Sequence, residues 1–294
     1  MSGAGHVISV DEFLGMTSLR CAVLGSPIEH SLSPQLHTAG YRALGLDMDY
    51  VRVEAGESRD IRRLMEESDG LVRGFSVTMP GKQAALELSD LATTRAQEIG
   101  SANTLVPQGD GQWLADNTDV DGVARCLEYI GGGDTAGLRG AHAVIVGNGG
   151  TARPAVAALA AAGVERVTVL ARSERALNLQ SVVETLGMEF SWSRFEEADI
   201  ARTCADAAVV VSTIPAHAAA ELSAGLCAAA GIVDVIYDPY PTPLLSAAQA
   251  KAVPHADGLR MLAGQAEEQF RLFTGKSAPE GLMLDTVLQA KGQL

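Results

Sequence analysis

The clearest structural signal in this chain is AHAVIVGNGGTARPAVAALAAAGVERVTVLAR, residues 141–172. Its first apolar run, residues 143–146, is short and bounded by a turn, as in a strand buried on both faces of a parallel sheet. The alanine-rich residues 151–162 predict a helix that stops at Gly163. A second strand, residues 167–171, completes a βαβ crossover, so a Rossmann-like α/β domain is expected here.

The glycine-rich turn between the first strand and the helix is typical of a dinucleotide site. Gly147 permits the tight turn, Gly149 lets the backbone approach a pyrophosphate, and the small Ala152 allows the helix to pack closely on the sheet. The helix N-terminus adds N–H donors and the positive end of its dipole. An ordinary glycine turn is the alternative. The residues predicted to bind the dinucleotide are Gly147, Asn148, Gly149, Gly150, Thr151 and Ala152.

The end of the second strand indicates which dinucleotide binds. An NAD site usually carries an acidic residue there for the ribose 2′-hydroxyl, but Glu165 precedes the strand and lies at its wrong end. Arg172 and Ser173 follow the strand and could pair with a 2′-phosphate. Glu174 could compensate Arg172, and a solvated surface arginine is the alternative. The pattern favours NADP.

Composition narrows the classes of protein and partner. The 294 residues are 47% hydrophobic, enough for two modest domains with separate cores. A net charge of −14 argues against nucleic acid and anionic membranes as partners. No signal peptide and no apolar run of about 18 residues is recognisable, so a cytoplasmic protein is expected.

The four cysteines show no metal-ligand spacing, so they are expected to be buried reduced thiols, and no metal site is predicted. They are Cys21, Cys126, Cys204 and Cys227.

Strands and helices alternate along the N-terminal part, which predicts a second α/β domain with a mainly parallel sheet. Ser33 is expected to cap a helix over residues 34–44. The glycine-rich residues 131–140 read as a linker. Further strands are expected at residues 20–25, 50–53, 72–78, 208–212 and 231–237, a hairpin at 103–106 and 112–115, and helices at 58–67, 83–88, 93–99, 120–129, 260–273 and 281–289.

Three polar clusters carry candidate chemistry. Ser31 and Ser33 flank a helix start, where hydroxyls and N–H groups suit a carboxylate, although Ser33 could be a cap only. Residues 76–82, SVTMPGK, place a hydroxyl and the amine of Lys82 at the carboxyl end of a strand, where ligands bind in open α/β sheets, although an ordinary surface lysine is the default alternative. Residues 116–119, DNTD, form the third cluster, which by itself could be a helix cap. Beside an NADP site, these clusters suggest an oxidoreductase with a proton donor and acceptor.

Seven motifs, in this order, resemble the shikimate dehydrogenase family over about residues 20–275. They are GSPIEHSLSPQLH, SVTMPGK, GSANTL, DNTDVDG, GNGGTA, DVIYDP and GLRMLAGQAEEQF. The resemblance implies reduction of 3-dehydroshikimate to shikimate with NADPH, in aromatic amino-acid biosynthesis. It also implies a substrate-binding and catalytic domain at residues 1–130, an NADP-binding domain at 131–257, and helices at 258–294 that return to the substrate domain.

The resemblance also implies a role for individual residues. Lys82 and Asp119 are similar to the catalytic pair, and Ser31 and Ser33 to carboxylate-binding serines. Two departures concern Ser76 and Ala171, where the family usually has Asn. Thr78, Asn103 and Gln265 are similar to ligands of the ring hydroxyls, and Arg172 and Ser173 to the 2′-phosphate ligands. Two residues resemble cleft residues: Tyr237, counted with the substrate site, and Gly258, counted with the cofactor site.

The predicted function is therefore that of an NADP-dependent shikimate dehydrogenase, a monomer or homodimer that needs no metal. An NAD-preferring quinate/shikimate dehydrogenase is the nearest alternative, and Arg172 argues against it. A non-catalytic NADPH-sensing regulator is another, but it would not need Lys82, Asp119 and both serines together.

Overall fold

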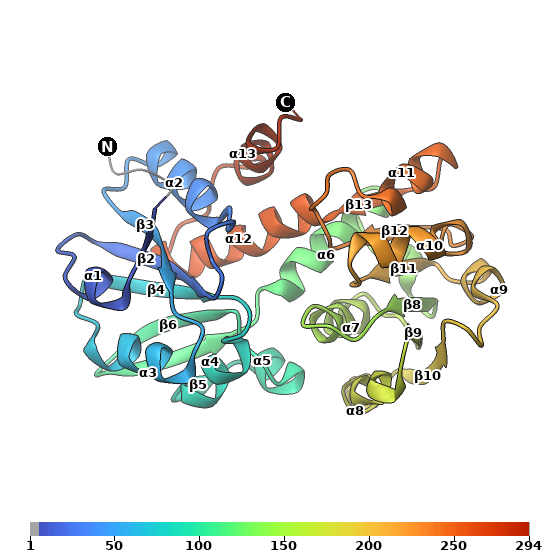
Figure 1. Cartoon of the computed structure of the whole chain (residues 1–294), viewed down its shortest axis with the longest axis horizontal. Coiled ribbons are helices and arrows are strands. Elements are labelled where there is room, and N and C mark those ends of the chain that lie inside the picture. The colour runs from blue at the N-terminus through green and yellow to red at the C-terminus, as the bar shows by residue number, and fades with distance from the viewer. Residues whose placement is uncertain (1–5, 294) are drawn as a thin grey trace. The chain divides into compact units, whose positions relative to one another are not determined.

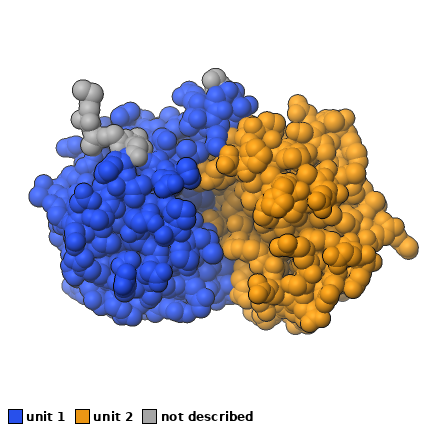
Figure 2. All heavy atoms as spheres, viewed as in Figure 1, with its two compact units in different colours: residues 1–118, 265–294 blue, residues 119–264 orange. Residues whose placement is uncertain are grey.

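The computed structural model describes residues 6–293. The chain forms two compact units (Figure 2). Unit 1 comprises residues 1–118 and 265–294, and unit 2 comprises residues 119–264. The predicted fold class is confirmed: both units are α/β, and the C-terminal segment belongs to the N-terminal unit.

Unit 1 is built on a seven-stranded sheet of order β1-β3-β2-β4-β6-β7-β5. Strands β2, β3, β4 and β6 of this sheet are labelled in Figure 1. Its ladders are parallel except where the antiparallel β6 pairs with β4 and β7. The strands are β1 Val7–Ile8, β2 Arg20–Gly25, β3 Asp49–Glu54, β4 Val72–Val77, β5 Leu91–Ala92, β6 Thr104–Gly109 and β7 Gln112–Asp116. The helices are α1 Val10–Leu14, α2 Ser33–Ala43, α3 Ser58–Glu67, α4 Lys82–Leu88, α5 Thr94–Ile99, the second part of α12 Gly258–Thr274, and α13 Leu282–Ala290.

The sequence explains why β2 lies near the middle of this sheet. All six of its residues, RCAVLG, are buried, as expected for a strand covered on both faces. The core that covers it gathers apolar side chains from α1, α3, β4 and the β6–β7 hairpin.

Unit 2 holds a six-stranded, fully parallel sheet of order β10-β9-β8-β11-β12-β13. In chain order this is 3-2-1-4-5-6, the strand order of the Rossmann fold. The strands are β8 His142–Val146, β9 Arg166–Ala171, β10 Glu189–Arg194, β11 Val209–Ser212, β12 Ile232–Asp234 and β13 His255–Asp257. The helices are α6 Asp119–Ile130, α7 Ala152–Ala161, α8 Gln180–Thr185, α9 Ile200–Ala205, α10 Ala216–Leu226 and α11 Pro243–Ala250, with 3-10 turns η1 Ala136–Leu138 and η2 Glu174–Leu179.

Two separate apolar clusters cover the two faces of this sheet. One holds side chains of α6, α7 and α8, and the other holds side chains of α9, α10 and α11. Helices on both faces allow a central strand such as β8 to be apolar, which is why residues 143–146 lack polar alternation.

Some expected boundaries differ from those in the structure. The strand expected at residues 231–237 ends at Asp234, because the Asp234 carboxylate accepts from the Ile236 N–H (3.3 Å) and the Thr242 hydroxyl (2.6 Å) and the chain turns there. Helix α12 begins at Gly258 instead of Arg260, and the Asp257 carboxylate accepts from the Arg260 N–H (2.9 Å) in its first turn. Residues 131–140, expected as a linker, lie inside unit 2.

All four cysteines are buried free thiols, as predicted. None of the helices between residues 6 and 293 combines the length and the apolar character needed to cross a bilayer.

Candidate functional site

The glycine turn follows the carboxyl end of β8, beside the point where the strand order of unit 2 reverses. Gly147 has φ of +96°, and a Cβ there would lie 2.8 Å from the Thr213 hydroxyl and 2.6 Å from Ile214, so only glycine is accommodated. Asn148, Gly149 and Gly150 are exposed, whereas Ala152 is buried where α7 begins. The turn therefore exposes residues 148–150, whereas the first N–H of α7, that of Ala152, donates to the Gly149 carbonyl (3.0 Å).

Arg172 and Ser173 are exposed directly after β9. The sequence left open whether Glu174 neutralises Arg172. In the structure Arg194 donates to the Glu174 carboxylate at 3.1 Å instead. Within residues 6–293, Arg172 makes no hydrogen bond or ion pair.

These features suit a dinucleotide that carries a 2′-phosphate. Gly147 lacks the Cβ that would obstruct the turn, the helix N-terminus offers N–H groups, and Arg172 has a guanidinium available for an anion. Ala171 is buried at the end of β9 and adds no polar contact.

The loop after β2 carries Ser31 and Ser33. Ser33 was expected to cap α2, and this was wrong: α2 starts at Ser33 itself, its N-cap is Leu32, and no side chain caps it. The Ser33 N–H instead donates to the Ser31 hydroxyl (3.3 Å). Arg52 on β3, 4% exposed, donates from Nε to the Ser31 carbonyl (2.9 Å), so a buried guanidinium holds this loop.

Thr78 and Lys82 follow the carboxyl end of β4, next to β2 in the sheet. The Thr78 N–H donates to the Leu24 carbonyl (2.8 Å), and its own carbonyl accepts from the Gly81 N–H (2.9 Å). Lys82 is the first residue of α4, and its carbonyl accepts from the Ala102 N–H (2.9 Å). Both side chains are partly buried.

Asn103 lies at the same edge, because it precedes the antiparallel β6 and its carbonyl accepts from the Val77 N–H (2.7 Å). Its side chain is 2% exposed, and its Oδ1 accepts from the Thr118 N–H at 2.8 Å. The carboxyl ends of β2 and β4 and the start of β6 thus collect Ser31, Ser33, Thr78, Lys82 and Asn103 on one edge of the unit 1 sheet.

Asp116 organises the DNTD cluster. Arg95 donates to both of its carboxylate oxygens (2.7 Å each), while the Thr93 hydroxyl (2.7 Å) and the Asn117 N–H (2.8 Å) donate to Oδ1. Burial raises the pKa of Asp116, but these hydrogen bonds outweigh it and leave the pKa below the ordinary value. Asp116 is therefore a structural anchor for the chain that leads to Asp119.

The remaining predicted residues are divided between the units. Gln265 lies on α12 in unit 1 and is 7% exposed. In unit 2, Asp119 is the buried first residue of α6, and Tyr237 is partly buried after β12, where burial raises its pKa. Gly258 packs so tightly that a Cβ would lie 2.4 Å from the Val235 carbonyl oxygen, which gives this glycine a packing reason as well.

Sequence reasoning missed two residues at the edge of unit 1, Arg52 and Gln269, and Gln269 is the partner of Ser76. Ser76 was expected to make a different contact from the usual asparagine. In the structure its hydroxyl donates to Gln269 Oε1 at 2.7 Å, across 193 positions of sequence. No local pattern signals such a pair, although the burial of a glutamine on an apolar helix face could have been suspected from the motif GLRMLAGQAEEQF.

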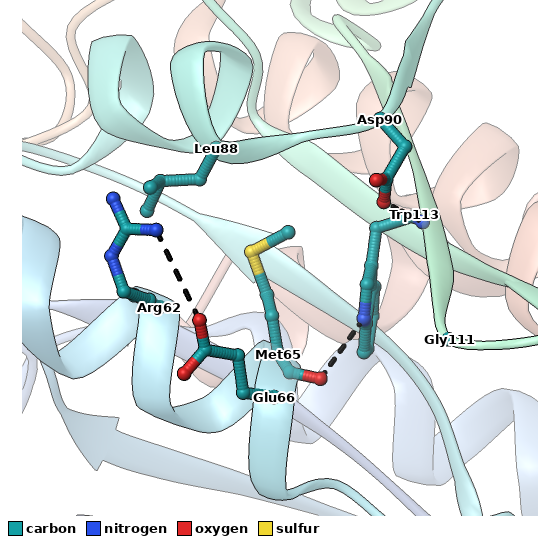
Figure 3. A pocket seen from close by; sticks show the side chains of 7 residues that line it. All are labelled: Arg62, Met65, Glu66, Leu88, Asp90, Gly111 and Trp113. Atoms are coloured by element: carbon teal, nitrogen blue, oxygen red, sulfur yellow. Dashed lines mark hydrogen bonds and ion pairs between the residues drawn. The ribbon is translucent and has the colours of Figure 1, made fainter.

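A separate pocket of about 240 Å³ lies at the other end of the unit 1 sheet (Figure 3). Trp113, near the start of β7, forms one wall and donates from its indole to the Met65 carbonyl (3.1 Å). At the rim of this pocket, Arg62 Nη1 and Glu66 Oε1 of α3 form an ion pair at 3.9 Å. None of the predicted site residues lines it. Among residues 6–293, no group of three or more His, Cys, Asp or Glu side chains could hold a metal ion.

Two family models and several known proteins are similar to this chain. Residues 23–105 match the family model described as the shikimate dehydrogenase substrate binding domain, and residues 258–288 match that of the shikimate 5'-dehydrogenase C-terminal domain. The chain is 37% identical over 269 residues to the shikimate dehydrogenase (NADP(+)) of Citrifermentans bemidjiense, covering 89% of this chain and 91% of the relative.

Two solved structures extend the comparison. Mycobacterium tuberculosis shikimate dehydrogenase superposes with a TM-score of 0.84 at 43% identity, covering 92% of this chain and 99% of that one. Quinate dehydrogenase of Corynebacterium glutamicum in complex with NAD superposes with a TM-score of 0.81 at 28% identity, covering 92% and 99%. Because the relatives match over nearly their full length, this chain belongs to the shikimate dehydrogenase family.

Proposed function

We propose that this protein is an NADP-dependent shikimate dehydrogenase, which reversibly reduces 3-dehydroshikimate to shikimate for aromatic amino-acid biosynthesis. The observation that carries the proposal is the free Arg172 beside a glycine turn that has no room for side chains at Gly147. The relatives named shikimate dehydrogenase (NADP(+)) support the same activity.

The cofactor would be held by unit 2. Backbone N–H groups of residues 148–151 receive the pyrophosphate, while Gly147 and Ala152, whose N–H groups donate to the Leu170 (2.8 Å) and Gly149 (3.0 Å) carbonyls, shape the turn. Arg172 with Ser173 receives the 2′-phosphate. Gly258 belongs to the cofactor site in this proposal, and Tyr237 to the substrate site. When bound, NADPH supplies the hydride for the substrate carbonyl carbon.

The substrate would be held by the loops at the carboxyl edge of the unit 1 sheet. Ser31 and Ser33 donate to its carboxylate, and Thr78, Asn103 and Gln265 bind its ring hydroxyls. Lys82 gives a proton to the carbonyl oxygen during reduction and takes it back during oxidation, and Asp119 holds and orients the same hydroxyl. Residues 1–130 with the helices of 258–294 then serve substrate and catalysis, and residues 131–257 serve NADP.

A cytoplasmic monomer or homodimer is part of the proposal. Small-angle scattering of the purified protein, giving its mass in solution, decides between the two states.

One spectrophotometric experiment tests the proposed function. Purified protein is given shikimate or quinate with NADP or NAD at equal concentration, and reduction is followed at the nicotinamide absorbance. Turnover of shikimate with NADP well above all other pairs is expected. A preference for quinate with NAD would favour the second candidate, which the likeness to the Corynebacterium glutamicum enzyme supports. No turnover with any pair would contradict both.

A further inference from the structure

A chain of buried hydrogen bonds runs beneath the edge of unit 1 that carries Asn103. The Tyr50 hydroxyl lies 2.5 Å from Ser76 Oγ, and Ser76 Oγ lies 2.7 Å from Gln269 Oε1. Gln269 Nε2 donates to Thr104 Oγ1 (2.9 Å) and to the Asn103 carbonyl (3.1 Å). Gln269 is 1% exposed, so water cannot replace these partners.

The amide of Gln269 sets the direction of every proton in this chain. Its Nε2 donates twice, so Oε1 can only accept, and the single hydroxyl hydrogen of Ser76 must point to it. Tyr50 must then donate to Ser76. On the other side, Thr104 accepts from Gln269 and directs its own hydrogen to Asn103 Oδ1 at 2.7 Å.

These donors converge on one oxygen of the Asn103 amide. Thr104 Oγ1 (2.7 Å), the Thr118 N–H (2.8 Å) and the Thr118 hydroxyl (3.1 Å) all donate to Asn103 Oδ1. The Asn103 Nδ2 donors are thereby fixed on the opposite side of the amide. Gln269 also follows Gln265 by one turn of α12, so the same helix face carries both.

We propose that Gln269 is a positioning residue for the reaction: through Thr104 and the Asn103 backbone it fixes the orientation in which Asn103 meets the substrate. The inference rests on the proposed function, because it takes Asn103 as a ligand of a substrate hydroxyl. Ser76 and Tyr50 keep Gln269 itself in one orientation.

Steady-state kinetics of the full-length enzyme tests the inference. Gln269→Met keeps the length of the side chain and removes its hydrogen bonds. We expect it to raise the KM for shikimate roughly 3- to 10-fold, which corresponds to the net contribution of one neutral hydrogen bond. The KM for NADP should be nearly unchanged. Val72→Ala, a buried change at the other end of β4, is the control for lost stability. An equal shikimate KM in the two variants overturns the inference.

Two further variants make the result independent of folding. Thr104→Val breaks the next link with almost no change of shape, and it should raise the KM for shikimate similarly. The Gln269→Met, Thr104→Val double variant should have a KM scarcely higher than either single variant, because both changes break the same chain of hydrogen bonds; additive losses overturn the inference.

Gln269→Glu can donate a hydrogen bond only while its carboxyl is protonated, so its shikimate KM should rise with pH more than that of the parent enzyme. A pH profile parallel to the parent contradicts the proposed direction of the hydrogen bonds.

Asn103→Ala separates this inference from the proposed function. If Asn103→Ala raises the KM for shikimate, but Gln269→Met raises it no more than Val72→Ala does, the positioning role of Gln269 alone is excluded. If Asn103→Ala leaves the KM for shikimate unchanged, Asn103 does not bind the substrate, and both its assigned role in the proposed function and the positioning role of Gln269 are excluded.

Discussion

Arg172 is the residue on which cofactor choice should depend. A charge-assisted hydrogen bond to a 2′-phosphate is worth about 1.5–3 kcal/mol, so Arg172→Ala should weaken NADP binding roughly 10- to 150-fold and barely change NAD binding. Calorimetry with both cofactors measures this. Arg166→Ala, at the exposed start of the same strand, is the matched control and should leave both affinities unchanged. Equal losses for NADP and NAD in Arg172→Ala would contradict the assignment.

Lys82 and Asp119 should act as one unit. A positioned proton-transfer group contributes about 10²–10⁴-fold, so Lys82→Ala should lower kcat by that order and change shikimate affinity little. Asp119→Asn keeps the shape but loses the charge, and it should also lower kcat strongly. The double variant should be scarcely worse than Lys82→Ala.

Rapid-quench turnover and calorimetry separate the two effects, with the exposed Lys276→Ala as the control. A Lys82→Ala enzyme with normal kcat and weak shikimate binding would make Lys82 a binding residue only.

Single residues in the glycine turn were predictable because their chemistry is local. A tight turn between a strand and a helix needs glycine at its sharpest position, and Gly147 with φ of +96° fills it. The ion pair of Glu174 was not predictable, because its partner Arg194 lies on β10. The sequence of that strand, EFSWSR, has no clear apolar pattern.

At the scale of elements, the loop between β2 and α2 should recognise the substrate carboxylate. Ser31→Ala with Ser33→Ala should raise the KM for shikimate and leave that for NADP nearly constant. The KM for shikimate methyl ester should rise far less than the KM for the acid, because only the acid offers a carboxylate to the two serines. Because Ser31→Ala also removes the acceptor of the Ser33 N–H, the melting temperature of each variant is measured beside the kinetics. Equal losses for acid and ester would leave the serines as loop supports.

The end of β12 should make the stability of unit 2 depend on pH. Burial raises the pKa of Asp234 to about 6, with a further contribution from the neighbouring Asp257 charge, against hydrogen bonds that lower it. The folded protein therefore binds this proton more tightly than the unfolded chain. Its free energy of unfolding should fall by roughly 2–3 kcal/mol as pH rises from about 4 to about 6, and stay level above that.

The Asp234→Asn side chain cannot titrate, so the free energy of unfolding of this variant should no longer fall between these pH values. Its amide oxygen can still accept the hydrogen bond from Thr242. Urea unfolding at a series of pH values measures the difference between parent and variant, and the exposed Asp285→Asn is the control. Parallel pH curves for parent and Asp234→Asn would contradict the prediction.

Elements with strong periodicity were predicted closely, and those ended by side chains were not. Residues 58–67 have charged and apolar faces at helical spacing, and α3 has those bounds. The strand at residues 231–237 was predicted too long because its apolar run continues past Asp234, whose bonds to Ile236 and Thr242 end the ladder. β13, with the sequence HAD, has no strand pattern and exists because β12 pairs with it.

At the scale of the whole molecule, the family and the fold class were predictable because motifs and alternating elements extend over nearly the entire chain. The exact positions where the chain passes between the units were not. They fall after Thr118 and after Gly264, the second inside the continuous helix α12. Helical periodicity does not show which unit a turn of the helix packs against, so the sequence does not give these positions. The glycine-rich residues 131–140, expected as a linker, lie inside unit 2.

The buried cysteines can report when each unit opens, because an alkylating reagent must reach their thiols. Cys21 lies in unit 1, and Cys126, Cys204 and Cys227 lie in unit 2. Burial raises the pKa of Cys21 to about 12 and that of Cys204 to about 11, so an alkylating reagent should reach them only when a unit opens. Saturating NADP should then slow alkylation of the three unit 2 cysteines far more than that of Cys21, as mass spectrometry of each peptide can report. Equal slowing of all four would mean that the two units open together as a single cooperative body.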